Sequence, residues 1–390
     1  MIATDVKRKS RPRIGLDLHV VDGIFQGSRT HCLELFSRVI ALTPECDFVI
    51  FANDKQPLLT FSQSFGLPHV HHVPMRHRSS PVRLIWQLPQ LVRRHGVSLL
   101  HTQYIAPPLP FCATAVTVHD ILFESHPQYF DRSFVLRSRL LVRSSVKRSA
   151  LVFTVSEFSR NEIRMRYGIS GEQIHAIPNG VDQIRFCPGT AGWEVPHALG
   201  LEHRKYFLTV GRLDPRKNHA SLLQAWGMLP VPRPRLVLVG QRHRGTPDLF
   251  LQIRTLGLES DVLVLEAISD QELPALYRHA RGFIYCSWAE GFGIPLLEAM
   301  VSGVPVVSSA NTALAEVGSG AVLWAAADRP GHIAAAVAML DRSEILRAQL
   351  ITRGFERAKC FSWEKSAIVV RDAYLRYFGA GRLVANMRVE

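Results

Sequence analysis

Short apolar runs alternate with longer amphipathic segments along most of the chain. In the first half, the runs that predict strands cover residues 13–18, 47–52, 70–73, 99–103, 115–118, 151–155 and 174–177. Helical periodicity lies between several of them, as in the apolar positions Leu33, Phe36 and Ile40. This alternation predicts a mostly parallel sheet with helices on both faces, and ligands of such sheets bind beyond the carboxyl ends of the strands.

The same alternation starts again in the second half, after an irregular stretch. Residues 178–182 read P-N-G-V-D, a turn, and residues 187–204 are rich in Pro, Gly and Trp without clear periodicity. Strands are predicted at residues 206–210, 235–239, 262–265, 282–286, 304–308 and 321–324, and helices at residues 330–340, 344–359 and 363–378. We therefore expect an α/β protein with a first domain at residues 1–185, a linker at 186–204, a second domain at 205–362 and a terminal helix at 363–390.

Composition is that of an ordinary globular chain. With 390 residues, 47% hydrophobic and 20% charged, it can form two or three domains with cores of their own. No apolar run reaches the roughly 18 residues of a membrane span, and the N-terminus lacks the apolar core of a signal peptide. We expect a cytoplasmic protein whose six scattered cysteines are reduced thiols.

The net charge of +13 is concentrated in the first half of the chain. Nucleic acid, an anionic membrane and acidic substrates are all compatible partners. The sequence lacks aromatic residues interleaved with Lys and Arg on a strand, and it lacks helix-turn-helix and zinc-finger spacings. We therefore expect no nucleic-acid partner. Because of the charge, a basic nucleic-acid-binding protein is kept as the alternative from another functional class.

Residues 132–156 contain many basic residues and no acidic one. One helix face should carry basic side chains four residues apart: Arg139, Arg143 and Lys147. The apolar positions expected to pack inward are Leu136, Leu140 and Val146. Such a face is either simply solvated or docks on the anionic inner face of the cytoplasmic membrane.

Residues 287–308 read S-W-A-E-G-F-G-I-P-L-L-E-A-M-V-S-G-V-P-V-V-S and combine a glycine loop with a helix start. Gly291 and Gly293 permit a sharp turn close to a ligand, and Pro295 fits the first helical position. Such a helix N-terminus favours a phosphate, and most naturally a diphosphate. Glu290 and Glu298, the latter in the first helical turn, would flank this site and accept hydrogen bonds from sugar hydroxyls. For either glutamate taken alone, the preferred interpretation is that Glu298 complements the helix dipole and Glu290 is a solvated loop residue; the whole string is more specific than its parts.

The loop after residues 206–210 reads G-R-L-D-P-R-K-N-H and places Arg212, Arg216 and Lys217 before a helix. Arg and Lys can stabilise the negative charge that develops on a departing nucleoside diphosphate, in place of a metal. His119 directly follows the strand at residues 115–118, where the alternative is a hydrogen-bonded core histidine. Ser156 is a good N-cap for a helix at residues 157–167.

Metal binding is not expected. The run of histidines at positions 69, 71 and 72 is assigned to a solvated loop before Pro74, because no acidic or cysteine partner at useful spacing accompanies it. The chain also contains no D-x-D triplet.

The E-x7-E spacing of Glu290 and Glu298, with G-F-G, Pro295 and G-V-P-V-V, resembles the retaining glycosyltransferases of family 4. Their GT-B architecture pairs two Rossmann-like domains around a cleft, and the resemblance covers nearly the whole chain. It implies that the last helix returns to the first domain, with residues 374–378 packing there. The string V-H-D-I-L-F-E-S-H-P-Q-Y-F is similar to a subgroup that includes O-antigen mannosyltransferases. The chain departs from the family at Ala315, where a proline usually precedes the glutamate.

The resemblance also implies roles for individual residues. Arg212 and Lys217 match the pair that binds the diphosphate, and His119 lies beside the donor sugar, so the expected catalytic residues are His119, Glu290, Arg212 and Lys217. The expected donor-binding residues are Gly27, Gly211, Arg212, Lys217, Gly291, Phe292, Gly293, Ile294 and Glu298. The family is metal-independent, so the implied requirement is a nucleotide-sugar donor without a metal or another cofactor.

We therefore expect transfer of a hexose to a lipid-linked or growing polysaccharide acceptor, with retention at the anomeric carbon. The subgroup implies GDP-mannose as the donor, with a UDP-linked hexose as the second choice. The family is described as reacting on one face of the sugar, with the leaving phosphate accepting the acceptor's proton. A phosphorylase or a sugar-nucleotide epimerase of the same fold explains R-x4-K and E-x7-E together less well.

Overall fold

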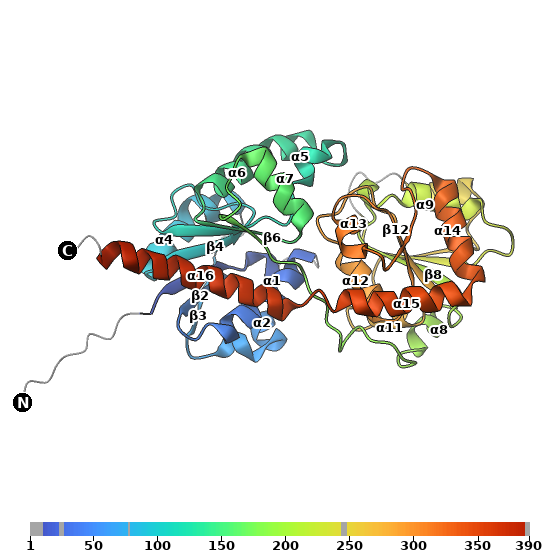
Figure 1. Ribbon diagram of the computed structural model, residues 1–390, viewed down its shortest axis with the longest axis horizontal. Coiled ribbons are helices and arrows are strands. Elements are labelled where there is room, and N and C mark those ends of the chain that lie inside the picture. The colour runs from blue at the N-terminus through green and yellow to red at the C-terminus, as the bar shows by residue number, and fades with distance from the viewer. Residues whose placement is uncertain (1–10, 23–26, 77–78, 243–247, 387–390) are drawn as a thin grey trace, which may run out of the picture.

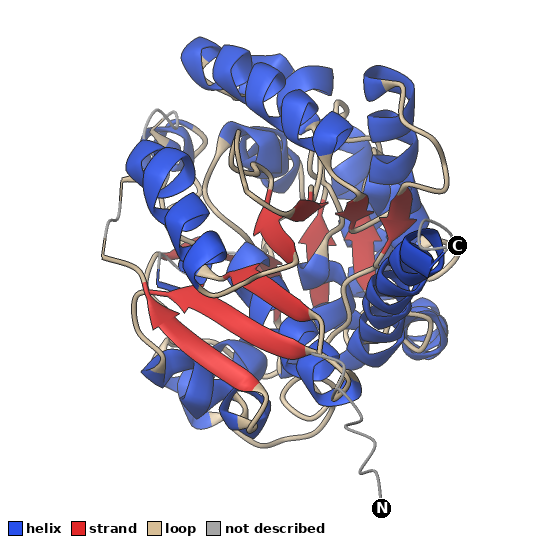
Figure 2. Ribbon diagram, turned by 90° about the vertical axis from the view of Figure 1, so that its left-hand side faces the viewer, coloured by secondary structure: helices blue, strands red, loops and turns tan. Residues whose placement is uncertain are grey.

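The computed structural model describes residues 11–22, 27–76, 79–242 and 248–386 and folds them into two α/β domains side by side (Figure 1). Each domain has a sheet of parallel strands with helices packed around it (Figure 2). The predicted fold class, two Rossmann-like domains with a terminal helix crossing back, is therefore confirmed.

The first sheet has seven strands in the order β3-β2-β1-β4-β5-β6-β7, all parallel. The strands are β1 (Arg13–Asp17), β2 (Asp47–Ala52), β3 (Val70–Pro74), β4 (Leu99–Gln103), β5 (Ala113–Thr117), β6 (Leu151–Thr154) and β7 (Ile174–Ala176). Each overlaps a strand that the apolar runs predict. The order reverses between β1 and β4, which opens a crevice at the carboxyl ends of these strands.

The helices of the first domain are α1 (Gly27–Leu42), α2 (Gln56–Phe61), α3 (Ser80–Val82), α4 (Leu88–Arg94), α5 (Leu122–Ser125), α6 (Arg132–Arg148) and α7 (Glu157–Tyr167). The predicted cap of α7 is confirmed, because the Ser156 hydroxyl accepts a hydrogen bond from the Ser159 amide and Gly168 closes the helix in the left-handed conformation.

Two expectations for the first domain need correction. The sequence predicts a loop with Gly23 and Gly27 at residues 20–28, but Gly27 is already the first residue of α1 and Gly23 lies outside the described residues. The histidines at 69, 71 and 72 do not share a solvated loop, because the last two lie in the edge strand β3. Nε2 of His72 donates to the Phe65 carbonyl oxygen at 2.8 Å.

The exposed face of α6 differs from the prediction. Leu136 and Leu140 are 63% and 65% exposed, whereas the inward face is made of other residues. These are Val135, Ser138, Val142, Ser145 and Val146. At 3.6 residues per turn, positions 136 and 140 fall on the opposite side, together with Arg139, Arg143 and Lys147. The expected inward packing was wrong for the two leucines and correct for Val146.

The second sheet has six parallel strands in the order β10-β9-β8-β11-β12-β13. They are β8 (Tyr206–Val210), β9 (Arg235–Val239), β10 (Val262–Leu265), β11 (Gly282–Tyr285), β12 (Val306–Ser308) and β13 (Leu323–Trp324). Here the order reverses between β8 and β11, so the loops that follow these two strands lie next to each other.

The remaining helices are α8 (Glu194–Ala198), α9 (His219–Gly227), α10 (Leu249–Thr255), α11 (Leu273–Arg278), α12 (Ile294–Val301), α13 (Ala313–Gly318), α14 (Pro330–Arg342), α15 (Glu344–Ala358) and α16 (Trp363–Asn386). The expected linker at residues 186–204 is not irregular, since it contains α8. It packs on the second domain, where Arg278 donates to the carbonyl oxygens of Cys187 and Ala191. A helix of five residues is too short to show the periodicity that would predict it.

Helix α16 crosses to the first domain and packs along α1, as expected (Figure 1). Tyr374 is fully buried there, with its hydroxyl 2.5 Å from Nδ1 of His101. Trp363 lies so close to Gly180 that a Cβ there would stand 2.5 Å from the Trp363 nitrogen. Within the described part of the chain, no helix combines the length and apolar character needed to cross a membrane.

Candidate active site

A cleft of about 500 Å³ lies between the two domains, at the carboxyl ends of both sheets. Its walls follow β4, β5 and β6 on one side and β8 and β11 on the other, where open α/β sheets bind ligands. It brings together all of the sequence-predicted site residues: Gly27, His119, Gly211, Arg212, Lys217, Glu290, Gly291, Phe292, Gly293, Ile294 and Glu298.

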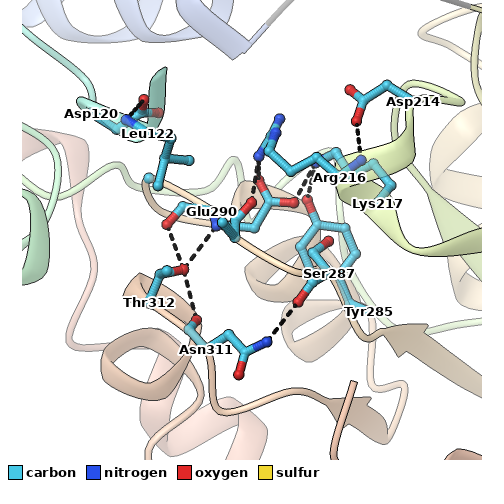
Figure 3. A network of polar contacts seen from close by, with 12 residues as sticks. Asp120, Leu122, Asp214, Arg216, Lys217, Tyr285, Ser287, Glu290, Asn311 and Thr312 are labelled. Carbon is cyan, nitrogen blue, oxygen red and sulfur yellow. Dashed lines mark hydrogen bonds and ion pairs between the residues drawn. The ribbon is translucent and has the colours of Figure 1, made fainter. Parts of the chain in front are cut away.

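Glu290 is the centre of a polar network on the second-domain wall (Figure 3). Its carboxylate accepts hydrogen bonds from Nζ of Lys217 at 2.6 Å and from a guanidinium nitrogen of Arg216 at 2.9 Å. Burial by itself would raise the pKa of Glu290, but the charges of Arg216 and Lys217 outweigh it and lower the pKa to about 2. Glu290 is therefore ionised at neutral pH.

Thr312 fixes the backbone of Glu290. Its hydroxyl accepts from the Glu290 amide at 2.8 Å and donates to the Glu290 carbonyl oxygen at 2.9 Å (Figure 3). Thr312 itself has a φ of 53°, a conformation that costs energy for a β-branched residue. The loop is held in a defined position by contacts from the next β–α connection.

Lys217 is buried beneath the glycine that opens its loop. A Cβ on Gly211 would lie 3.3 Å from Cε of Lys217, so the missing side chain leaves room for the lysine. Burial lowers the pKa of Lys217, and the carboxylate of Glu290 works against this shift. Asn218 anchors the loop by donating to the carbonyl oxygens of Cys286 and Ala327, at 3.0 and 2.7 Å.

The two arginines of this loop differ in position. Arg212 lines the cleft with an exposed side chain, whereas Arg216 bonds Glu290 and also donates to the Ala289 carbonyl oxygen at 2.5 Å. The sequence places both arginines in one loop and does not distinguish them. Arg216 is thus a site residue that the R-x4-K spacing alone does not select.

The glycine loop leads into α12 as the sequence suggests. Gly293 is the N-cap with a φ of 108°, where a Cβ would lie 2.7 Å from Leu314. Ile294 starts the helix, so Pro295 is its second residue rather than its first. The ring of Phe292 packs at right angles to Phe361 in the core. The start of α12 faces the cleft with the positive end of its dipole.

Glu298 lies in the second turn of α12, not in the first as expected. Burial raises its pKa to about 7, and the hydroxyl of Tyr277, which donates to it at 2.9 Å, offsets this shift in part. A ligand that donates hydrogen bonds to the Glu298 carboxylate would stabilise the ionised form and lower this raised pKa.

His119 forms the facing wall, at the end of β5. Its Nε2 lies 3.1 Å from Oε1 of Gln103, and its ring packs edge-on against His31 at 4.6 Å between centroids. Burial and the neighbouring His31 lower the pKa of His119 well below the usual value, so the ring is neutral. Because the Gln103 oxygen only accepts, Nε2 carries the proton and Nδ1 is left as an acceptor.

Asp120, next in the chain, also lines the cleft, although it is not among the expected catalytic or donor-binding residues. Its carboxyl pKa is raised by burial, with Arg216 acting in the opposite direction. A Cβ on Gly291 would lie 2.4 Å from Oδ2 of Asp120. The first and second domains therefore touch here across the cleft.

Comparison with known proteins matches each of the two domains to a family of glycosyltransferases. Residues 25–185 match the model of the Glycosyltransferase Family 4 domain, and residues 193–357 match that of Glycosyl transferases group 1. The chain is 35% identical to O-antigen chain mannosyltransferase B of Escherichia coli over 82% of this chain and 81% of that protein. It is 34% identical to O-antigen chain mannosyltransferase RfbU of Salmonella typhimurium over 50% of this chain and 51% of that one.

Solved structures share the fold at lower identity. A sucrose-phosphate synthase from Thermosynechococcus elongatus has a TM-score of 0.75 at 19% identity, covering 95% of this chain and all of that one. The Anabaena protein HepE, solved with UDP and glucose, has a TM-score of 0.73 at 18% identity, covering 94% and 100%. With both domains matched in sequence and structure, the chain belongs to glycosyltransferase family 4 and is a GT-B glycosyltransferase.

Proposed function

We propose that the protein transfers mannose from GDP-mannose to a lipid-linked or growing polysaccharide acceptor, with retention and without a metal ion. The observation that carries the proposal is the ionised Glu290, with Lys217 and Arg216 bound to it, opposite His119. The choice of mannose rests on relatives that are named mannosyltransferases.

In this proposal the second domain binds the nucleotide. The diphosphate lies at the start of α12, within reach of the cations Arg212 and Lys217, and Glu298 accepts hydrogen bonds from the ribose hydroxyls. As the bond between the anomeric carbon and the diphosphate breaks, negative charge grows on the phosphate oxygens. The cations stabilise this charge in the role that a metal plays elsewhere.

The state of Glu290 argues against a covalent intermediate on this residue. A carboxylate bonded by two cations, with a pKa of about 2, is a weak nucleophile and a weak base. We therefore propose reaction on one face. The acceptor oxygen bonds to the anomeric carbon, the diphosphate leaves, and the proton of the acceptor hydroxyl passes to a phosphate oxygen. Nδ1 of His119 accepts a hydrogen bond from a sugar hydroxyl and thereby orients the sugar ring.

Peripheral membrane contact is part of the proposal. Leu136 and Leu140 are exposed among the basic side chains of α6, which gives one helix face both apolar and cationic groups. Such a face suits a bilayer with anionic lipids, where a lipid-linked acceptor resides.

Donor hydrolysis without acceptor tests the central claim. The purified protein is incubated with GDP-mannose and, separately, with UDP-glucose, and release of the nucleoside diphosphate is followed. Release of GDP is expected; release of UDP alone would contradict the mannose assignment. With a panel of lipid-linked acceptors, proton NMR of the product should show an anomeric configuration identical to that of the donor, and an inverted product would contradict retention.

A further inference from the structure

A carboxylate of the second domain caps a helix of the first. Glu316, on α13, accepts hydrogen bonds from the backbone amides of Glu157 at 3.0 Å and Phe158 at 2.9 Å. These amides open α7, where the first N–H groups have no partner within the helix. The charge also complements the positive end of the helix dipole. Figure 1 shows α7 and α13 facing each other where the domains meet.

The same turn of α7 holds the loop that carries Glu290. The buried hydroxyl of Ser156 donates to the carbonyl oxygen of Gly291 at 2.8 Å, and Ser159 donates to the same oxygen at 3.4 Å. Gly291 directly follows Glu290 and touches Asp120, beside His119. These contacts therefore set the separation between the two walls of the cleft.

Glu316 is itself anchored in the second domain. Arg357, on α15, donates to the carbonyl oxygens of Glu316 at 2.6 Å and Val317 at 3.1 Å. The backbone that carries the Glu316 carboxylate is thus bonded to α15 and is part of the packed second domain.

We propose that Glu316 is a positioning residue for glycosyl transfer, whose carboxylate fastens α7 to the second domain and holds the cleft closed. In the proposed function the second domain binds the nucleotide, whereas His119 lies on the first domain. Loss of this fastening should slow transfer and leave nucleotide affinity unchanged. The inference depends on the proposed donor only for the choice of substrate.

The test uses the backbone amide itself. Glu157→Pro removes one of the two amides, proline fits the first helical position, and Ser156 already has the extended backbone that a residue before proline prefers. Glu157→Ala is the matched control, since it removes the same side chain and keeps the amide. Glu316→Ala removes the acceptor, and Glu316→Asp tests whether a shorter carboxylate restores part of the function.

For Glu316→Ala we expect kcat to fall about tenfold, the size of about one charge-assisted hydrogen bond, with an unchanged Kd for GDP. The kcat of Glu157→Pro should fall less, and that of Glu157→Ala should equal the wild-type value. Glu316→Asp should retain part of the kcat that Glu316→Ala loses. The double variant Glu157→Pro/Glu316→Ala should have the same kcat as Glu316→Ala alone. Small-angle X-ray scattering with GDP should show a larger radius of gyration for Glu316→Ala.

Wild-type turnover in Glu316→Ala, additive losses in the double variant, or equal losses in Glu157→Ala and Glu157→Pro would overturn the inference. If GDP-mannose is not a substrate, the kcat values of the same variants are measured with the nucleotide sugar that the protein hydrolyses. The scattering measurement, made with the corresponding nucleoside diphosphate, separates failure of the domain contact from failure of the donor assignment.

Discussion

Nζ of Lys217 lies 2.6 Å from a carboxylate oxygen of Glu290, on the loops that follow two neighbouring strands of the second sheet. This pair links a cation expected to meet the diphosphate to an acid expected to meet the sugar. Both side chains are almost completely buried, so each strongly affects the charge of the other.

Removing the lysine should damage catalysis far more than folding. We expect Lys217→Ala to lower kcat by roughly 10² to 10³, as is typical for the loss of one donor to developing charge. Lys205→Ala, which removes an exposed lysine paired with Glu202, is the control. Wild-type activity should persist in excess chelator; a strict need for Mg²⁺ or Mn²⁺ would contradict the assignment of the cations.

Glu298 should release a proton when nucleotide binds. The pKa of about 7 leaves much of the free protein protonated at about pH 6, and ribose hydroxyls donate to the ionised form and lower this pKa. Calorimetry of GDP binding at that pH, in buffers of different ionisation enthalpy, measures the release. Glu298→Gln should abolish this release and weaken binding, whereas Glu290→Gln should mainly slow transfer. Unchanged GDP affinity in Glu298→Gln would exclude the ribose role.

The same shift gives the unliganded protein a stability that depends on pH. A carboxyl group with a raised pKa in the fold binds its proton more tightly than in the unfolded chain. Its contribution is therefore present below about pH 4.5 and is lost as the pH rises to about 7. The midpoint of thermal unfolding should fall less over this range for Glu298→Gln than for wild type; parallel curves would show that Glu298 does not titrate as proposed.

His119 should act as a neutral hydrogen-bonding group. Because its pKa is well below 6.5, kcat should show no histidine titration between about pH 6 and pH 8. His119→Ala should reduce kcat strongly and leave the Kd for GDP unchanged, while the exposed His332, on α14, can be replaced without effect. A variant that loses GDP affinity as much as turnover would place His119 at the nucleotide instead.

The α6 surface should bind anionic vesicles through two separable contributions. Replacing Arg139, Arg143 and Lys147 by glutamate should abolish sedimentation with anionic liposomes at low salt. Leu136→Ser/Leu140→Ser should weaken the binding that remains at high salt, because apolar insertion is not screened. Arg254→Glu/Arg353→Glu, on the second domain, is the control for altered charge. Equal recovery of wild type on neutral vesicles would argue against the proposed surface.

The sequence by itself determined the architecture and the principal site. Apolar runs of strand length alternate with helical periods, and this local pattern is enough to predict a parallel α/β fold. Glycines, Pro295 and the spaced glutamates predict a strand, loop and helix start within about twenty residues, so an anion-binding helix N-terminus beside Glu290 could be predicted from the sequence. The residues predicted for the site do line one cleft.

Only the tertiary structure decided which partners these residues meet. Arg216 and Lys217 are adjacent in the chain, yet their contact with Glu290 joins loops more than seventy positions apart. Glu316 caps a helix 159 positions away, and nothing in its local sequence names that helix. Leu136 and Leu140 are apolar, but α6 packs on the domain through its opposite face, so both side chains are exposed to solvent. Periodicity reports how residues share a face, whereas long-range packing decides which face is buried and which charges meet.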